Sequence, residues 1–188
     1  MPNADLPSHY ARTLRTLLRF ACAMLLAGLL AGVLFQESSK KLAPGSVPDG
    51  LQLQATLGLA LIHGHVLVSG MLVPLACAGA LLVARRIGGR ELKPATLAWL
   101  TRGYLPFLGL TLALMLFKAY HVLLAVRRGD TDLGAIDERF FFGLEPARHA
   151  VYALAHVGMA LSLGVFAVAL WRSLGSGQRA PASRSSLT

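Results

Sequence analysis

The sequence predicts an all-α integral membrane protein, an antiparallel bundle of four transmembrane helices with both termini in the cytoplasm. Hydrophobic residues make up 55% of the 188-residue chain, and charged residues only 14%, against roughly 25% in soluble domains. The mean hydropathy is +0.58. The apolar residues are also gathered into blocks longer than the ~20 residues that a bilayer requires. A water-soluble domain of this size could not bury so much apolar surface.

The apolar blocks define the domain organisation. The four spans are expected at about residues 17–36, 53–84, 97–126 and 149–171. They form a transmembrane domain over residues 14–174, preceded by a polar head (1–13) and followed by a tail (175–188). The tail is rich in Ser, Gly, Ala and Arg, a composition typical of disordered segments.

Two spans carry local signals. The second exceeds the thickness of a bilayer, so we expect it to tilt or to kink at Pro74. In the first, the steps Ala27-Gly28 and Ala31-Gly32 place small residues on one face, where a neighbouring helix can approach closely.

The net charge of +9 reflects membrane orientation. The basic residues lie at the ends of apolar blocks, and no basic stripe with interleaved aromatic residues indicates nucleic-acid binding. Lys and Arg concentrate at the start of the chain (Arg12, Arg15 and Arg19), in the 85–102 connection and in the segment from Arg172 to the end of the tail. The positive-inside rule therefore predicts cytoplasmic termini in a bacterial inner (plasma) membrane, with the lipid bilayer as partner.

Ionisable residues inside the spans mark a candidate site, because such residues are costly in a membrane. No charged residue occurs from Gly50 to Ala84, yet this block holds His63 and His65. Their expected depth is about 15–18 Å from the outer end of the second span, at 1.5 Å per residue. The other intramembrane ionisable residues are Lys118 and His121 on the third span and His156 on the fourth. All fall in the outer half or near the midplane, which indicates one site opening outward.

Helical geometry assigns different roles to the paired histidines. His63 and His65 are two residues apart, or about 200° around a helix. They cannot share one metal ion unless the helix unwinds at Gly64. One should therefore face the bundle axis while the other meets a neighbouring helix. His156 is the expected partner of a histidine of span two, across a haem b or around a copper or iron ion. The candidate metal ligands are thus His63, His65 and His156.

The remaining polar residues are assigned to the rim of the site. Lys118 and His121 share a helix face and are expected at the outer rim, where they can bind an anion such as a haem propionate, although Lys118 can also simply snorkel. Glu37 and His149, near the outer interface, are possible polar partners. Alternatively, the histidines hydrogen-bond to the backbone across helices or form a proton relay.

A short motif carries a family resemblance. The run Leu59 to Met71 resembles the HxHxxxxGM signature of a family of small bacterial four-span membrane proteins of unknown function. The end of span one at Glu37 and the step Ala155-His156 are also similar. The resemblance implies four helices and selects Glu37, His63, His65 and His156 as family-like positions, but it implies no reaction.

These observations favour a multi-pass membrane protein that binds haem b or a metal ion in a redox or respiratory role. A second copy of the chain or a respiratory complex is the implied protein partner. The alternatives are a proton-coupled transporter and an accessory or assembly subunit without chemistry of its own. No nucleophile motif, phosphate-binding glycine loop or thiolate zinc pattern is present, so hydrolysis has no support, and the residues name no reaction.

Overall fold

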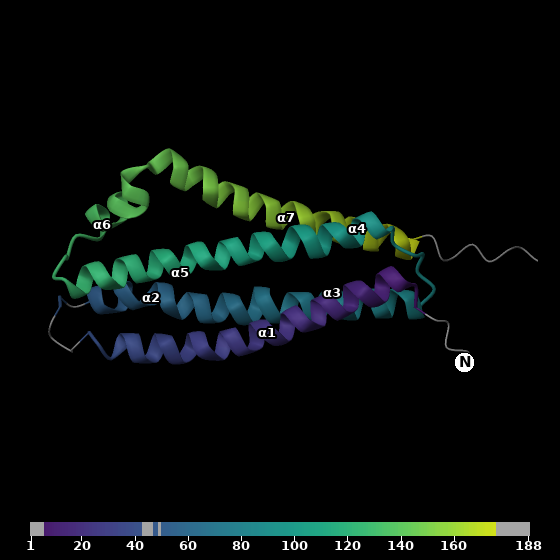
Figure 1. Ribbon diagram of the computed structural model, residues 1–188, viewed down its shortest axis with the longest axis horizontal. Helices are drawn as coiled ribbons and strands as arrows, with labels where there is room; N and C mark the ends of the chain where they lie inside the picture. Colours follow the sequence, from purple (N-terminus) through teal and green to yellow (C-terminus); the bar gives the residue numbers. More distant parts are fainter. Residues whose placement is uncertain (1–5, 43–46, 49, 176–188) are drawn as a thin grey trace, which may run out of the picture.

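Four long apolar helices make up the computed structural model (Figure 1), which describes residues 6–42, 47–48 and 50–175. They run over Ser8–Ser39, Leu51–Arg86, Pro94–Arg127 and Glu145–Gly175, and each is long and apolar enough to cross a membrane. The described part of the chain contains helices and no β-strand. This confirms the expectation of an all-helical, multi-pass membrane protein.

Two of the long helices change their winding along their length. The second consists of α2 (Leu51–His65), η1 (Val66–Leu72) and α3 (Val73–Arg86). The third consists of α4 (Pro94–Trp99), η2 (Leu100–Tyr104) and α5 (Leu105–Arg127). The first and the fourth are α1 (Ser8–Ser39) and α7 (Glu145–Gly175), and the connection before α7 holds α6 (Leu133–Arg139) and η3 (Phe140–Gly143).

The first long helix begins within the polar head predicted over 1–13. α1 begins at Ser8, and Tyr10 is 1% exposed. Its hydroxyl accepts a hydrogen bond of 2.7 Å from the Leu92 backbone amide, so the head packs on the 87–93 connection. Residues 1–5 of the head and 176–188 of the expected tail lie outside the described residues, and Gly175 is the last residue of α7.

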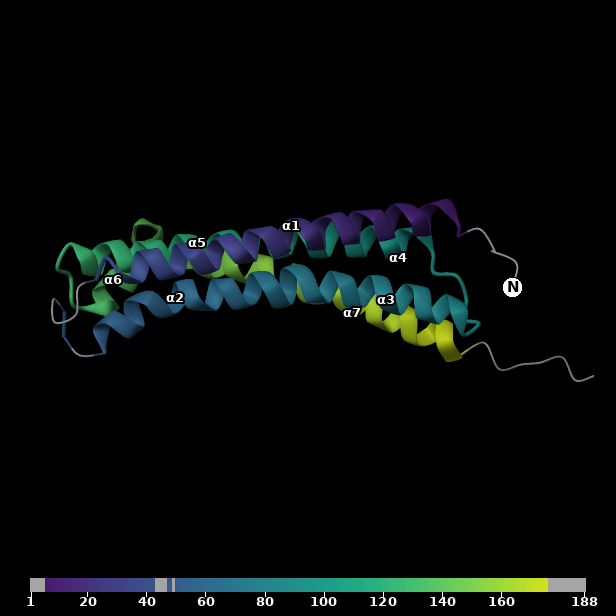
Figure 2. The ribbon, with the colours of Figure 1, turned by 90° about the horizontal axis from the view of Figure 1, so that it is seen from below.

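The two ends of the molecule are packed differently. The start of α1 and the end of α7 lie at the same end of the molecule, here called the terminal end (Figure 1). The short helix α6 lies at the opposite end, here called the α6 end. At the terminal end α1 packs on α3 and α4, and α7 packs on the same two helices. Figure 2 shows α1 and α4 above α3 and α7 there. A continuous apolar core fills this end and includes Leu17, Leu81 and Leu100.

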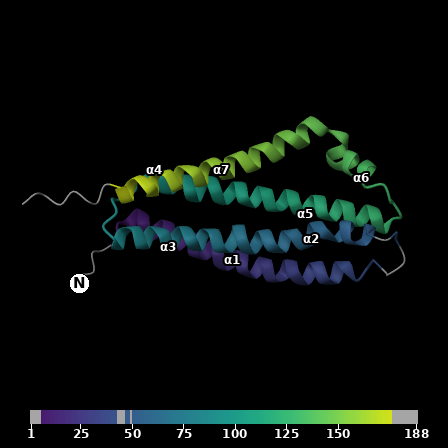
Figure 3. The same cartoon turned by 180° about the vertical axis from the view of Figure 1, so that it is seen from behind.

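The α6 end is more open. α2 packs on α1 and α5, whereas α7 packs on α5. Figure 3 shows α7 diverging from α5 as it approaches α6. A second core, which includes Leu59, Leu123 and Ile136, joins α2, α5 and α6.

Each π-helical segment ends two residues before a proline. η1 precedes Pro74, and η2 precedes Pro106. A proline inside a helix has no amide hydrogen, and its ring clashes with the carbonyl four residues earlier. A wider π turn moves that carbonyl aside. The expected perturbation at Pro74 therefore takes the form of a π-helical segment.

The two π segments are joined by a hydrogen bond. In the π register the Val73 amide donates to the Val68 carbonyl, five residues back. The same register would assign the Ser69 carbonyl to the amide of residue 74, which is Pro74 and has none. The Tyr104 hydroxyl donates to this carbonyl instead, at 2.7 Å. A side chain of η2 thus satisfies the acceptor that Pro74 leaves unpaired in η1.

Close helix approach at α1 follows the small-residue face. A Cβ at Gly28 would lie 2.5 Å from the Leu67 side chain, and one at Gly32 would lie 3.1 Å from the His63 ring. A larger residue at either position would displace the Leu67 or the His63 side chain, because α2 and η1 lie against α1 there. The spacing of small residues in the first span correctly predicts this contact.

We expect Tyr104→Phe to lower the free energy of unfolding by roughly 1 kcal/mol, because it removes the donor to the Ser69 carbonyl. Pro74→Ala restores a backbone amide near this carbonyl, so the cost of Tyr104→Phe should be smaller in the Pro74→Ala background. Thermal unfolding of the wild type, the two single variants and the double variant in one detergent measures this difference. Tyr120→Phe is the control. The Tyr120 hydroxyl lies 3.4 Å from the Ser38 Oγ and does not bond a carbonyl that a proline leaves unpaired. Equal costs in both backgrounds would contradict the assignment.

Candidate functional site

A cavity of about 290 Å³ lies between α2, α5 and α7 at the α6 end. Gln54 and Leu61 line it from α2, Lys118 from α5 and Tyr152 from α7. The Tyr152 hydroxyl donates to the Leu114 carbonyl at 3.3 Å and so ties α7 to α5 beside the cavity. α2 and α7 each pack on α5, so α5 forms the floor between them.

His65 and His156 do not line this cavity themselves, but each lies one helical turn beyond a residue that does. The Nδ1 of His65 lies 2.8 Å from the Leu61 carbonyl, and the Nδ1 of His156 lies 2.8 Å from the Tyr152 carbonyl. Leu61 and Tyr152 both line the cavity, and residues four apart share a helix face. α2 and α7 both run from the α6 end toward the terminal end (Figure 1). Each imidazole therefore lies one helical turn beyond the cavity wall, on the same side of it.

The hydrogen bonds fix which nitrogen each imidazole can offer. A carbonyl oxygen only accepts, so Nδ1 carries the proton in both rings. The neutral imidazole then keeps a lone pair on Nε2, the form in which histidine binds a metal. Both side chains are exposed at the surface of the described chain. His65 and His156 thus present two ligand nitrogens from two separate helices.

His63 is turned toward α1. Its Nδ1 lies 2.8 Å from the Gly28 carbonyl, and its ring occupies the space over Gly32. The ring is half-buried, unlike the exposed ring of His65. Of the two histidines of α2, His63 therefore contacts α1, and the angle of about 200° between them turns His65 away from α1.

Lys118 and His121 both contact α6. The Lys118 Nζ lies 2.7 Å from the Asp137 Oδ1, and the His121 Nε2 donates to the Ile136 carbonyl at 3.0 Å. Arg148 of α7 adds hydrogen bonds to the Asp137 carboxylate and carbonyl, at 2.9 and 2.8 Å. Asp137 is therefore a bridge between α5 and α7, and we call these contacts the α6 clasp.

The clasp also has an apolar part. Ile136 and Phe140 are buried, at 0% and 1% exposed, and the Phe140 ring lies 5.2 Å from Phe117 and 5.3 Å from His121. Phe142, in contrast, is 95% exposed. Phe140 and Phe142 therefore have different environments, the first inside the clasp and the second at the surface. The i, i+4 spacing of Ile136 and Phe140 is the sequence signal for a buried face, and the acidic composition of the connection conceals it.

The remaining candidates lie apart from the cavity. Glu37 pairs with Lys40 at 2.6 Å on the exposed end of α1, and His149 is exposed on the first turns of α7. Among the described residues, no group of three or more His, Cys, Asp and Glu side chains is close enough to hold a metal ion. The structure therefore separates the predicted site residues into a histidine pair at the cavity, a histidine–α1 contact and the α6 clasp.

The Asp137 carboxyl makes the clasp sensitive to acid. The hydrogen bond from Lys118 is the main cause that lowers the pKa of Asp137; burial opposes it, and the charges of Lys118 and Arg148 lower the pKa further. Because its pKa is lowered, the ionised Asp137 carboxylate stabilises the docked α6 fully at pH values above the ordinary aspartate pKa of about 3.9. That stabilisation is lost as the pH falls through the lowered value.

We expect Asp137→Asn to loosen α6 at neutral pH by about 1 kcal/mol, a modest value because the carboxylate is partly exposed. Hydrogen exchange of the amides of α6 should become roughly fivefold faster than in the wild type. Glu138→Gln is the matched control, since Glu138 is the exposed neighbouring carboxylate. Equal exchange in the two variants would show that Asp137 does not hold α6.

Comparison of the chain with protein-family models, with curated proteins and with solved structures yields no match. The resemblance to the family with the HxHxxxxGM signature therefore stays a prediction.

Proposed function

We propose that the protein is a haem b-binding membrane protein with a redox role, in which His65 and His156 would hold the haem iron. The observation that supports this most directly is the matched state of the two imidazoles. Each donates Nδ1–H to a carbonyl of its own helix and leaves Nε2 free. Each also lies one turn beyond a residue that lines the same cavity. Cofactor sites in helical bundles are commonly built from side chains on different helices, and histidine is a common haem ligand.

The donor set favours haem over a bare copper or iron ion. A metal ion held by protein alone usually needs three or four ligands. The described residues provide the histidine pair without a third ligating side chain close by. A porphyrin supplies four nitrogens of its own, so two axial histidines complete the coordination. When bound, haem b supplies one-electron transfer between the ferric and ferrous states.

The protein's own residues would orient the ligands and exclude water. The Leu61 and Tyr152 carbonyls hold the two rings and increase the basicity of Nε2. The cavity wall contributed by Leu57, Leu61 and Met115 is apolar. Lys118, at the α6 end of the cavity, has ammonium donors besides the one bound by Asp137. It can therefore also bind a carboxylate such as a propionate.

The membrane placement belongs to the same proposal. The terminal end carries basic residues on α1 and in the last turn of α3, including Arg12, Arg15, Arg85 and Arg86. The positive-inside rule places this end in the cytoplasm of a bacterial cell, as an antiparallel four-helix bundle of the inner membrane. The histidine pair then lies nearer the outer side, where a second copy or a respiratory complex would exchange electrons with it.

We expect the purified protein to take up haem b and to give the visible spectrum of a six-coordinate, low-spin haem. His65→Ala and His156→Ala should each abolish the low-spin spectrum, because each removes one axial nitrogen. His149→Ala is the matched control, being an exposed histidine two helical turns from His156. A protein that binds no haem, or a low-spin spectrum retained in both cavity variants, would refute the proposal.

The same variants separate the alternative functions. In a proton-coupled transporter, His65→Ala would abolish pH-dependent flux in liposomes. In an accessory subunit the histidines act only in helix contacts, as His63 does with Gly28. Substitution would then change thermal stability without changing a spectrum or a flux.

A further inference from the structure

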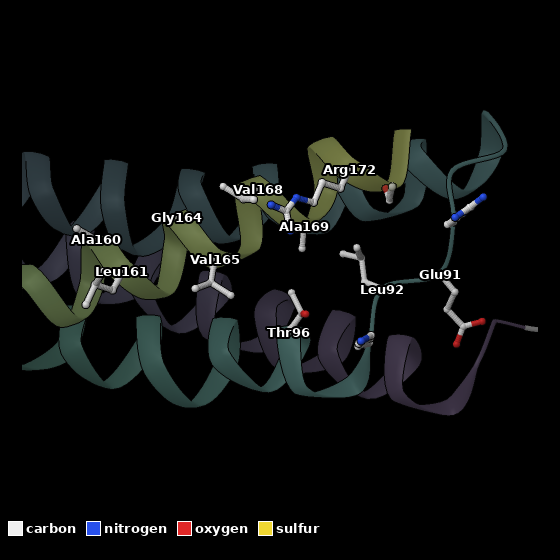
Figure 4. Close-up of a pocket in the computed structure, with 13 residues that line it drawn as sticks. Glu91, Leu92, Thr96, Ala160, Leu161, Gly164, Val165, Val168, Ala169 and Arg172 are labelled. Carbon is white, nitrogen blue, oxygen red and sulfur yellow. The ribbon is translucent and has the colours of Figure 1, made fainter. Parts of the chain in front are cut away.

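A larger cavity lies at the terminal end, between α4, α7 and the connection that precedes α4 (Figure 4). Its volume is about 710 Å³. One wall is an apolar stretch of α7, where Val165 points toward α4 and Thr96 of α4 points back toward α7 (Figure 4). This groove is separate from the histidine pair, which lies beside the cavity at the α6 end.

The mouth of the groove is basic. Arg90, Lys93 and Arg172 line it, and all three are exposed. Glu91 is the acidic lining residue. Its carboxylate lies 3.1 Å from the His9 Nε2 and extends away from the groove in Figure 4. The charge at the mouth is therefore strongly positive.

The groove has the length of one membrane leaflet. Its lining residues on α7 run from Ala160 to Ser173, which corresponds to about 18–20 Å at 1.5 Å per residue. Half of the hydrocarbon core of a bilayer is about 15 Å. The apolar part from Ala160 to Ala169 can accommodate an acyl chain, while the basic residues stand where the headgroup of that leaflet lies.

We propose that this groove binds an anionic phospholipid, with the phosphate at Arg90, Lys93 and Arg172 and one acyl chain along α7 between Ala160 and Ala169. Charge complementarity is the argument for this occupant, because basic pockets between transmembrane helices on the cytoplasmic side bind acidic headgroups. A zwitterionic lipid would fill the apolar groove equally well but would gain nothing from the basic mouth. The inference rests on the membrane placement proposed above and not on the haem.

The two tryptophans of the chain provide the readout. Trp99 is on α4 and Trp171 on α7, and both are exposed at the terminal end. The full-length protein is reconstituted in phosphatidylcholine vesicles, with a small fraction of brominated phosphatidylglycerol or of brominated phosphatidylcholine carrying the same acyl chains. Quenching of tryptophan fluorescence then gives the relative affinity for the two headgroups. We expect phosphatidylglycerol to be preferred by roughly tenfold or more.

Two variants test the two parts of the site. Arg90→Gln combined with Lys93→Gln should reduce the headgroup preference to a few-fold or less. Its matched control removes two basic residues at the α6 end, Arg127→Gln with Arg128→Gln, and should retain the preference. Gly164→Leu fills the groove and should abolish the preference as well, because a Cβ at Gly164 meets open space and the helix can accept it.

A leucine placed elsewhere in the bundle is the control for filling the groove. Gly79→Leu adds the same side chain on α3, at a glycine that also faces open space, and should leave the preference unchanged. Equal quenching by the two brominated lipids in the wild type would overturn the proposal. So would an equal loss in Gly79→Leu and Gly164→Leu. Displacement of the brominated phosphatidylglycerol by millimolar glycerol phosphate alone would show instead a site for soluble phosphates, and would also overturn it.

Discussion

The constraint on which this structure depends is that a backbone carbonyl inside a membrane must find a donor within the protein. Pro74 and Pro106 interrupt the hydrogen bonding of two long helices, and each is preceded by a π-helical segment. The Ser69 carbonyl, deprived of a partner by Pro74, receives the Tyr104 hydroxyl. This contact joins η1, in the middle of the second long helix, to η2, near the start of the third. Between this contact and the terminal end, the four long helices pack around one core. Between this contact and the α6 end, α7 diverges from α5 (Figure 3).

The same rule decides what the histidines can do. An imidazole in an apolar helix surface must bond at least one nitrogen, and a carbonyl one turn back is available to any residue whose side chain can reach it. His65 and His156 use that carbonyl, which leaves the second nitrogen for a partner outside their own helix. His63 uses a carbonyl of α1 instead. The helix that supplies the carbonyl therefore distinguishes a histidine that joins two helices from a histidine whose second nitrogen can bind a cofactor.

The four spans could be predicted from the sequence, because a helix that crosses a bilayer must be long and apolar, and both properties can be counted along the chain. It also indicated that His63 and His65 face different neighbours, since that follows from the helical angle alone. It did not show which of the two meets α1, because this depends on how α1 and α2 rotate against each other around Gly28 and Gly32. The partner of Lys118 was missed for a related reason. Asp137 lies 19 positions further along the chain, in a connection whose acidic composition hides the buried face of Ile136 and Phe140.

The α6 clasp determines how open the histidine site can be. α7 diverges from α5 toward this end (Figure 3), and such a gap in a helical bundle closes unless something holds it apart. α6 occupies that position, with Asp137 bonded to Lys118 on one side and to Arg148 on the other. Because Lys118 also lines the cavity, the clasp and the cavity share a wall. A short helix outside the membrane spans therefore links α5 and α7 at the end where the cavity lies.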